Sequence, residues 1–206
     1  MAIKVLVFGM TDNPGGMESC IMNYFRNIDP KVIHFDFLCN WEQMIYKEEV
    51  VNKGSKVYTI PQKSNNYNAY RKAMDIFFKE HAKDYDVLWY NTCTLTNIDY
   101  LIYAEKYGIG KRIIHAHNSA NETSAIRGAL HHINKKRIEK YATDFWSCSL
   151  AASQYFYREN IIASRRHHII NNAIATEKYQ YNENIRDRVR KELGIEHRCV
   201  VGHIYR

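Results

Sequence analysis

The stretch IKVLVFGMTDNPGGMESC, residues 3–20, sets the pattern of the whole chain. Its first six residues form an apolar, β-branched run that is typical of a fully buried strand. A polar turn with two adjacent glycines, Gly15 and Gly16, follows, and residues from Met17 onward have helical spacing. The glycines have two interpretations, a tight turn or a place where a charged group lies against the backbone.

The same alternation recurs to about residue 171. Strand-like runs occur at 3–9, 32–39, 55–60, 86–90, 112–116, 143–148 and 167–171. Strands that alternate with helices predict a parallel sheet covered on both faces, joined by right-handed crossovers. We therefore expect an α/β fold with a doubly wound, mainly parallel, Rossmann-like sheet.

The segments between the strands carry apolar stripes at helical spacing. Tyr70, Ala73, Phe77 and Phe78 form one of these stripes, and Ile126, Leu130, Ile133 and Tyr141 form another. The ordinary interpretation of such a stripe is core packing, and we expect it for all of them.

Composition excludes several classes of protein. Hydrophobic residues make up 46% and charged residues 25% of the 206 residues, as in soluble globular proteins. No apolar run is long enough to span a bilayer, and the N-terminus is expected to be a first core strand and not a signal peptide. Five scattered cysteines without C-x-x-C spacing indicate free thiols in a reducing compartment and no zinc site.

The net charge of +7 favours an anionic partner. Basic residues concentrate in HHINKKRIEK, residues 131–140, which is read either as a solvated helix face or as a face that rests on anionic lipid. No known nucleic-acid-binding motif is present, and we expect no nucleic-acid partner.

The C-terminal part differs from the rest. We expect a Rossmann-like domain over 1–174, a linker and short helix over 175–197, and the first strand of a further domain over 198–206. On this interpretation the chain stops where a second domain begins.

Three loops are expected at the carboxyl edge of the sheet, where ligands bind in open parallel sheets: 10–16, 91–94 and 117–124. The first brings Gly15 and Gly16 to a helix N-terminus, whose free N–H groups attract anions. The dinucleotide pattern G-x-G-x-x-G and the phosphate loop G-x-x-x-x-G-K-[ST] are both absent, which disfavours a nicotinamide or flavin cofactor.

The third loop follows HAHN, residues 115–118. His115 and His117 are two residues apart at a strand end, so their side chains are expected on one face. They are read as polar strand-end residues without a role, as a metal site, which lacks carboxylates at ligand spacing, or as groups that hydrogen-bond a polar substrate.

In order along the chain, GGMES, KRIIHAHNS, FWSCSLAASQYFY and IINNAIATEKYQYNENIRDRVRKELGI resemble the N-terminal half of a family 4 (group 1) glycosyltransferase of GT-B architecture. The final VVGHIYR resembles the first strand of the second half. The resemblance covers nearly the whole chain and indicates polysaccharide biosynthesis of the bacterial, capsule type.

The resemblance implies a cytoplasmic enzyme, peripheral on the inner face of the membrane, that moves a sugar from a nucleotide-sugar to a glycan or lipid-linked acceptor with retention and without a metal. Gly15, Gly16 and Arg206 would bind the donor diphosphate. His117 would be the catalytic histidine near the transferred sugar, and His115 and Asn118 would contact substrate.

Two positions depart from the family pattern, Ala175 in place of aspartate and Tyr205 in place of glycine, and the E-x7-E pair of the second half is absent. The resemblance therefore implies that this chain alone is inactive. The alternative is a non-catalytic Rossmann-like module that binds an anionic ligand.

Overall fold

Seven parallel strands form one sheet in the order β3-β2-β1-β4-β5-β6-β7. The computed structural model describes residues 1–119 and 124–202, and its chain divides into two units, Met1–Asn172 and Ala173–Arg206. The strands are β1 (Ile3–Phe8), β2 (Ile33–Cys39), β3 (Val57–Thr59), β4 (Val87–Thr92), β5 (Lys111–Ala116), β6 (Asp144–Ser147) and β7 (His167–Ile169). Each predicted strand is present, with ends within two residues of the expected ones, which confirms the predicted fold class.

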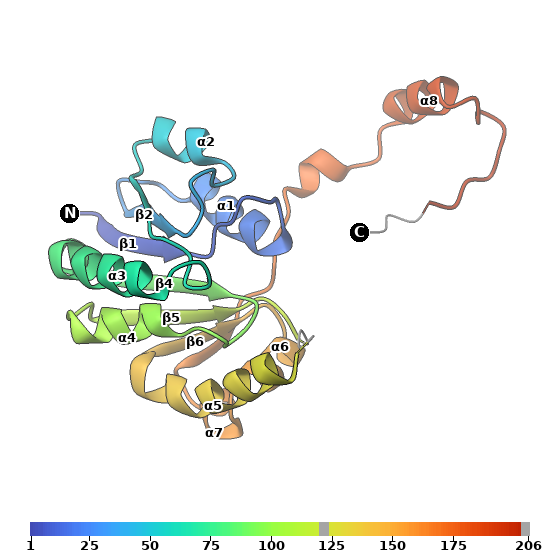
Figure 1. Ribbon diagram of the computed structural model, residues 1–206. Helices are drawn as coiled ribbons and strands as arrows, with labels where there is room; N and C mark the ends of the chain where they lie inside the picture. Colours follow the sequence, from blue (N-terminus) through green and yellow to red (C-terminus); the bar gives the residue numbers. More distant parts are fainter. Residues whose placement is uncertain (120–123, 203–206) are drawn as a thin grey trace. The chain divides into compact units, whose positions relative to one another are not determined.

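Helices cover both faces of this sheet (Figure 1). In the first unit they are α1 (Gly16–Asn27), α2 (Lys47–Asn52), α3 (Tyr67–His81), α4 (Asp99–Lys106), α5 (Ala125–Tyr141), α6 (Leu150–Phe156) and α7 (Glu159–Ile162). Residues of α1 and α2 pack on one face, around Val7, Phe37 and Trp89. Residues of α3 to α7 pack on the other face, around Leu6, Leu88 and Ile114.

The apolar stripe of α5 corrects one sequence expectation. Ile126, Leu130 and Ile133 are 74%, 41% and 51% exposed and lie outside the core, whereas Tyr141, the last residue of the predicted stripe, packs against the core. The buried side of α5 carries Ile138 together with two polar residues, His131 and Asn134. His131 and Asn134 hydrogen-bond the backbone N–H and C=O of Leu95, so these polar groups also find partners on the buried side.

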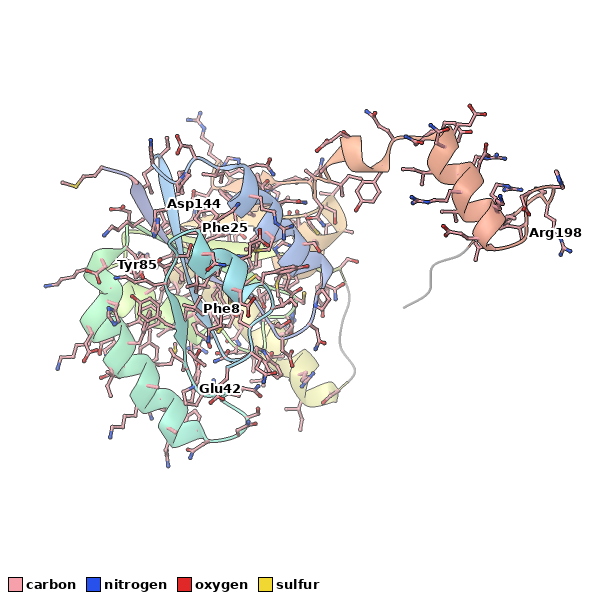
Figure 2. All side chains as sticks on the ribbon, turned by 90° about the horizontal axis from the view of Figure 1, so that it is seen from above. Phe8, Phe25, Glu42, Tyr85, Asp144 and Arg198 are labelled. Carbon is pink, nitrogen blue, oxygen red and sulfur yellow. The ribbon has the colours of Figure 1, made fainter. Side chains whose placement is uncertain are left out.

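The second unit contains a short 3-10 helix, Thr176–Tyr179, and α8 (Glu183–Glu192). No residue of α8 is buried, and its side chains stand out around the helix in Figure 2. Residues 199–202 are not in a strand, since a strand needs a neighbouring strand to pair with and this unit holds none among its described residues. The domain boundaries expected at 174 and 197, and the further strand, stay predictions.

Candidate functional site

The carboxyl ends of β1, β4 and β5 lie side by side, and the three predicted ligand loops leave the sheet there. Phe8 is in register with Tyr90, and Thr92 with Ala116. The glycine turn that follows β1 and the HAHN segment, which spans the end of β5, therefore flank the loop after β4.

The two glycines of the turn are open for different reasons. Gly15 is the N-cap of α1, with extended backbone and no side-chain cap. A Cβ on Gly15 would lie 2.5 Å from Oε2 of Glu18, whereas a Cβ on Gly16 would meet none of the described residues within 4 Å. Gly15 thus makes room for a side chain of its own helix, and the described part of the chain leaves the space at Gly16 open.

The side chain of Glu18 packs inside this turn, against Gly15 and Thr11. Its role was not predicted from the sequence. Its carboxylate is 4% exposed and accepts a hydrogen bond from the Thr11 hydroxyl at 2.7 Å. A carboxylate in the first turn of a helix is favoured by the positive end of the helix dipole. The position of Glu18 in GGMES, in the first turn of the expected helix, was the feature from which its role could have been predicted.

Asn91, a second residue that the sequence analysis missed, joins β1 to HAHN. It is fully buried at the end of β4, and its amide nitrogen donates to the carbonyls of Phe8 and Trp89 at 3.1 and 3.3 Å. Its amide oxygen lies 2.9 Å from Nε2 of His117. A polar residue in an otherwise apolar strand was the signal for it.

Gly9 makes this arrangement possible. Its φ of +133° suits glycine alone, and a Cβ there would lie 2.6 Å from Cβ of Asn91. The turn after β1, Asn91 and His117 therefore form one packed unit at the carboxyl edge.

The contact with Asn91 sets the tautomer of His117. Because the amide oxygen can only accept, Nε2 of His117 carries the proton and Nδ1 keeps its lone pair. Nδ1 is buried and has no hydrogen-bond partner among the described residues. Burial lowers the pKa of His117 to about 4, so the imidazole is neutral near pH 7 and can accept a hydrogen bond from a hydroxyl.

His115 lies on the same side as His117, as predicted, with ring centroids 4.1 Å apart. It is fully buried, and its ring stacks on Trp89 at 6.0 Å. Burial, and then the neighbouring His117, lower its pKa to about 3. With no exposed surface, His115 supports His117 by packing, and the geometry favours His117 as the residue that meets a ligand.

The remaining predicted site residues are less informative. Asn118 is half-buried, and its amide oxygen accepts a hydrogen bond from the backbone of Ser119 at 2.8 Å. Arg206 lies outside the described residues. Within residues 1–119 and 124–202 no cluster of His, Cys, Asp or Glu side chains could hold a metal ion, and no helix is long and apolar enough to cross a membrane.

A separate hollow of about 470 Å³ opens where β2 and β3 end. Its lining mixes one indole with amide, hydroxyl and carboxylate groups, from Asn40, Trp41, Glu42, Thr59, Gln62 and Asn65. Asn40 is held by Tyr100, whose hydroxyl donates to the amide oxygen at 2.8 Å, and by the carbonyl of Ile60. Glu42 is exposed at this end of the molecule (Figure 2). Sequence analysis did not foresee the hollow, because it is built from two loops that are distant in the chain.

Comparison with known proteins agrees with this geometry. No family profile matches the chain. It is 26% identical over 200 residues to "Putative glycosyltransferase EpsF" of Bacillus subtilis (strain 168), a match that covers 94% of this chain and 51% of EpsF. The chain thus spans about half the length of this curated relative.

Two solved structures place the fold. HepE of Anabaena, in complex with UDP, matches with a TM-score of 0.70 at 15% identity over 94% of this chain and 50% of that chain. The UDP-GlcNAc 2-epimerase of Methanocaldococcus jannaschii matches with a TM-score of 0.54 at 16% identity over 93% of this chain and 53% of that one. The sequence relative and the shared fold together confirm the resemblance: over nearly its whole length this chain is similar to the N-terminal half of glycosyltransferases of GT-B architecture.

Proposed function

We propose that this chain is the acceptor-side half of a retaining glycosyltransferase of family 4. The complete enzyme would move a sugar from a nucleotide-sugar to a glycan or lipid-linked acceptor in bacterial, capsule-type polysaccharide biosynthesis, in the cytoplasm and without a metal cofactor. The observation that carries the proposal is the placement of His117 at the carboxyl end of β5, where Asn91 holds its Nε2 at 2.9 Å and its buried Nδ1 has no hydrogen-bond partner among the described residues. The relationship to EpsF and the UDP complex of HepE support it.

The glycine turn would receive the donor diphosphate. The difficult step in breaking a sugar–diphosphate bond is the charge that develops on the leaving group. The open space at Gly16 gives an anion access to the first N–H groups of α1, and Arg206 would add a cation to the same diphosphate. Glu18 lies under the turn and fixes its shape.

His117 would bind the transferred sugar. Nδ1 is buried in this structure, so a small shift of the imidazole on sugar binding would bring its lone pair to a sugar hydroxyl, and the hydrogen bond would hold the sugar ring in place for attack. Positioning of this kind does not require the histidine to become charged.

The hollow beside β2 and β3 would hold the acceptor. Sugars present apolar ring faces together with many hydroxyls, and a half-buried indole beside amide groups suits both. Trp41 would provide the apolar wall, and Gln62 and Asn65 the hydrogen bonds.

The test uses the natural polypeptide that contains this chain and a panel of nucleotide-sugars. Sugar transfer is followed in the wild type and in Gly16→Val, with the anomeric configuration of the product read by NMR. Because a side chain at position 16 closes the approach to the helix amides, we expect transfer to fall about a hundredfold with the melting temperature nearly unchanged.

Gly110→Val is the matched control. A Cβ on Gly110 also meets nothing within 4 Å, but this residue precedes β5, at the opposite edge of the sheet, so its variant should keep wild-type transfer. Full transfer by a folded Gly16→Val protein would overturn the role of the turn. Ligand binding by the wild type without transfer would favour a non-catalytic binding module.

A further inference from the structure

A pocket of about 290 Å³ lies at the amino end of the sheet. It forms between two connections, the one from α1 to β2 and the one from α2 to β3, and residues of both line it. The glycine turn and His117 lie at the carboxyl ends of parallel strands, so this pocket and the candidate site are on opposite edges of the sheet. Its volume is close to the lower end of the range for small-molecule sites.

The walls of the pocket are largely apolar. The rings of Phe25 and Phe35 stack with their centroids 6.4 Å apart, and Ile28 and Ile33 also belong to the lining. Phe35 is buried, whereas Phe25, Ile28 and Ile33 are only half-buried at the margin of the core. A small apolar group in the pocket would remove more of these three side chains from water, which is favourable.

The charged groups of the lining are cationic. Two hydrogen bonds at 2.7 and 2.6 Å join Arg26 to Glu49, which lies outside the pocket. The ammonium group of Lys53 lies 5.3 Å from the centroid of the Phe25 ring and has no ion pair within 4 Å among the described residues. The hydrogen bond and charge of Arg26, together with the charge of Lys53, lower the pKa of Glu49. Two cations thus share one carboxylate, which leaves a positive charge at the pocket.

The fold holds these groups in place. The guanidinium group of Arg26 is fixed by Glu49 and lies 5.2 Å from the centroid of the Tyr46 ring. His34, which also lines the pocket, lies 3.1 Å from the carboxylate of Asp36. A site whose groups are already ordered loses less conformational entropy when a ligand binds.

We propose that this pocket binds a small organic oxyanion, a molecule with an apolar body and one carboxylate or phosphate group. The body would lie against Phe25, Ile28 and Ile33, and the oxyanion would pair with Lys53 on the solvent side. An inorganic anion would leave the apolar walls in water, and an uncharged molecule would leave Lys53 without an anion. The site shares no residue with the candidate site for sugar transfer and does not depend on that function.

Phenyl phosphate and benzoate are suitable probes, since each joins an aromatic ring to an oxyanion. Each is titrated into the isotope-labelled full chain and followed by NMR. We expect a dissociation constant on the order of 1 mM for molecules of this size, with nuclear Overhauser effects between the phenyl ring and Phe25 and Ile28. The probe that binds more tightly identifies the preferred oxyanion. Benzyl alcohol, which has no charge, and inorganic phosphate, which has no ring, should each bind at least about fivefold more weakly.

Three variants separate the contributions. Lys53→Gln keeps much of the side chain and removes its charge, so it should weaken the binding of phenyl phosphate about fivefold. Lys56→Gln is the matched control, because this lysine is also exposed but does not line the pocket, and it should bind like the wild type. Gly16→Val should also bind like the wild type, since the glycine turn lies at the other edge of the sheet.

Circular dichroism shows whether each variant is folded. The proposal is overturned if neither probe binds at concentrations up to about 10 mM, or if the nuclear Overhauser effects place the ring elsewhere on the chain. It is also overturned if inorganic phosphate or benzyl alcohol binds as tightly as the probes, or if the folded Lys53→Gln protein binds phenyl phosphate as the wild type does.

Discussion

At the scale of single residues, His115 lowers the stability of the fold through its unpaired ring nitrogens. Both of its ring nitrogens are buried without a hydrogen-bond partner among the described residues, and its side chain has no exposed surface. An unpaired buried polar group costs about 1–3 kcal/mol, which the stacking on Trp89 and His117 must offset.

We predict that His115→Phe makes the fold less sensitive to acid. The pKa of His115 is about 3 in the folded chain and has its usual value of 6.5 in the unfolded chain. Between these two pH values the unfolded chain therefore binds a proton at His115 and the folded chain does not. Stability from the neutral histidine is therefore full above pH 6.5 and declines as the pH falls toward 3. At pH 7 the phenylalanine variant should be as stable as the wild type or more so.

Urea unfolding at pH 7 and pH 5 measures the difference. Between these values the advantage of His115→Phe should grow by about 2 kcal/mol, from roughly 1.4 kcal/mol per pH unit below 6.5. His132→Gln changes an exposed histidine and serves as the control. Parallel pH curves for wild type and His115→Phe would contradict the prediction.

At the scale of elements, α5 holds two neighbouring backbone segments in place through hydrogen bonds from its side chains. His131 and Asn134 hold the loop after β4 at Leu95, and Lys135 holds the last turn of α6. The buried side of this helix thus carries polar groups next to the apolar Ile138, because two neighbouring backbone segments need hydrogen-bond partners there.

We predict that Lys135→Met lowers the free energy of unfolding by about 1–2 kcal/mol. The variant keeps the apolar stem but removes a charged donor to two carbonyls at a helix C-terminus. Lys136→Met, one residue along and exposed, should stay within about 0.5 kcal/mol of the wild type. Equal effects in thermal unfolding of the two variants would show that the carbonyl contacts contribute nothing.

The sequence predicted the sheet well and α5 poorly, for one reason. Buried parallel strands are apolar on both faces, so each strand is visible by itself as a short run such as IKVLVF. Which side of a helix is buried depends on what the neighbouring elements require. The spacing of Ile126, Leu130 and Ile133 can be seen in the sequence. The hydrogen bonds that the backbone of Leu95 makes with His131 and Asn134 can be seen only in the structure.

The site was predictable to the same extent. The place of His117 and of the glycine turn could be predicted because each lies in the loop that follows a recognisable strand, and their roles in binding stay predictions. Asn91 and the wall at Trp41 were missed, since their partners lie on other segments and only the fold brings them together.

At the scale of the whole molecule, the two units differ in how much they bury. Unit Met1–Asn172 contains the sheet and both apolar clusters. The ten residues of α8 bury none of their side chains, and Ile185 and Leu193 are 52% and 65% exposed. A helix of this length without packing is marginal in water.

We predict that brief trypsin treatment of the chain cuts α8 first. Arg186, Arg188, Arg190 and Lys191 offer sites there, and mass spectrometry should then detect a resistant fragment that contains Met1–Asn172 and ends at a lysine or arginine beyond it. Lys72 and Lys79 on the packed helix α3 are equally exposed to solvent and should be cut later. An early cut in α3 would contradict the prediction.

The amide of Asn91 also has a consequence over evolutionary time. Gly9, Asn91 and His117 are far apart in the chain, yet one side chain needs the first to be small and gives the last its orientation. A larger residue at position 9 would displace Asn91, and a change at Asn91 would remove the hydrogen bond that orients His117. Among relatives of this chain, the three residues should therefore be inherited together or replaced together, as a block.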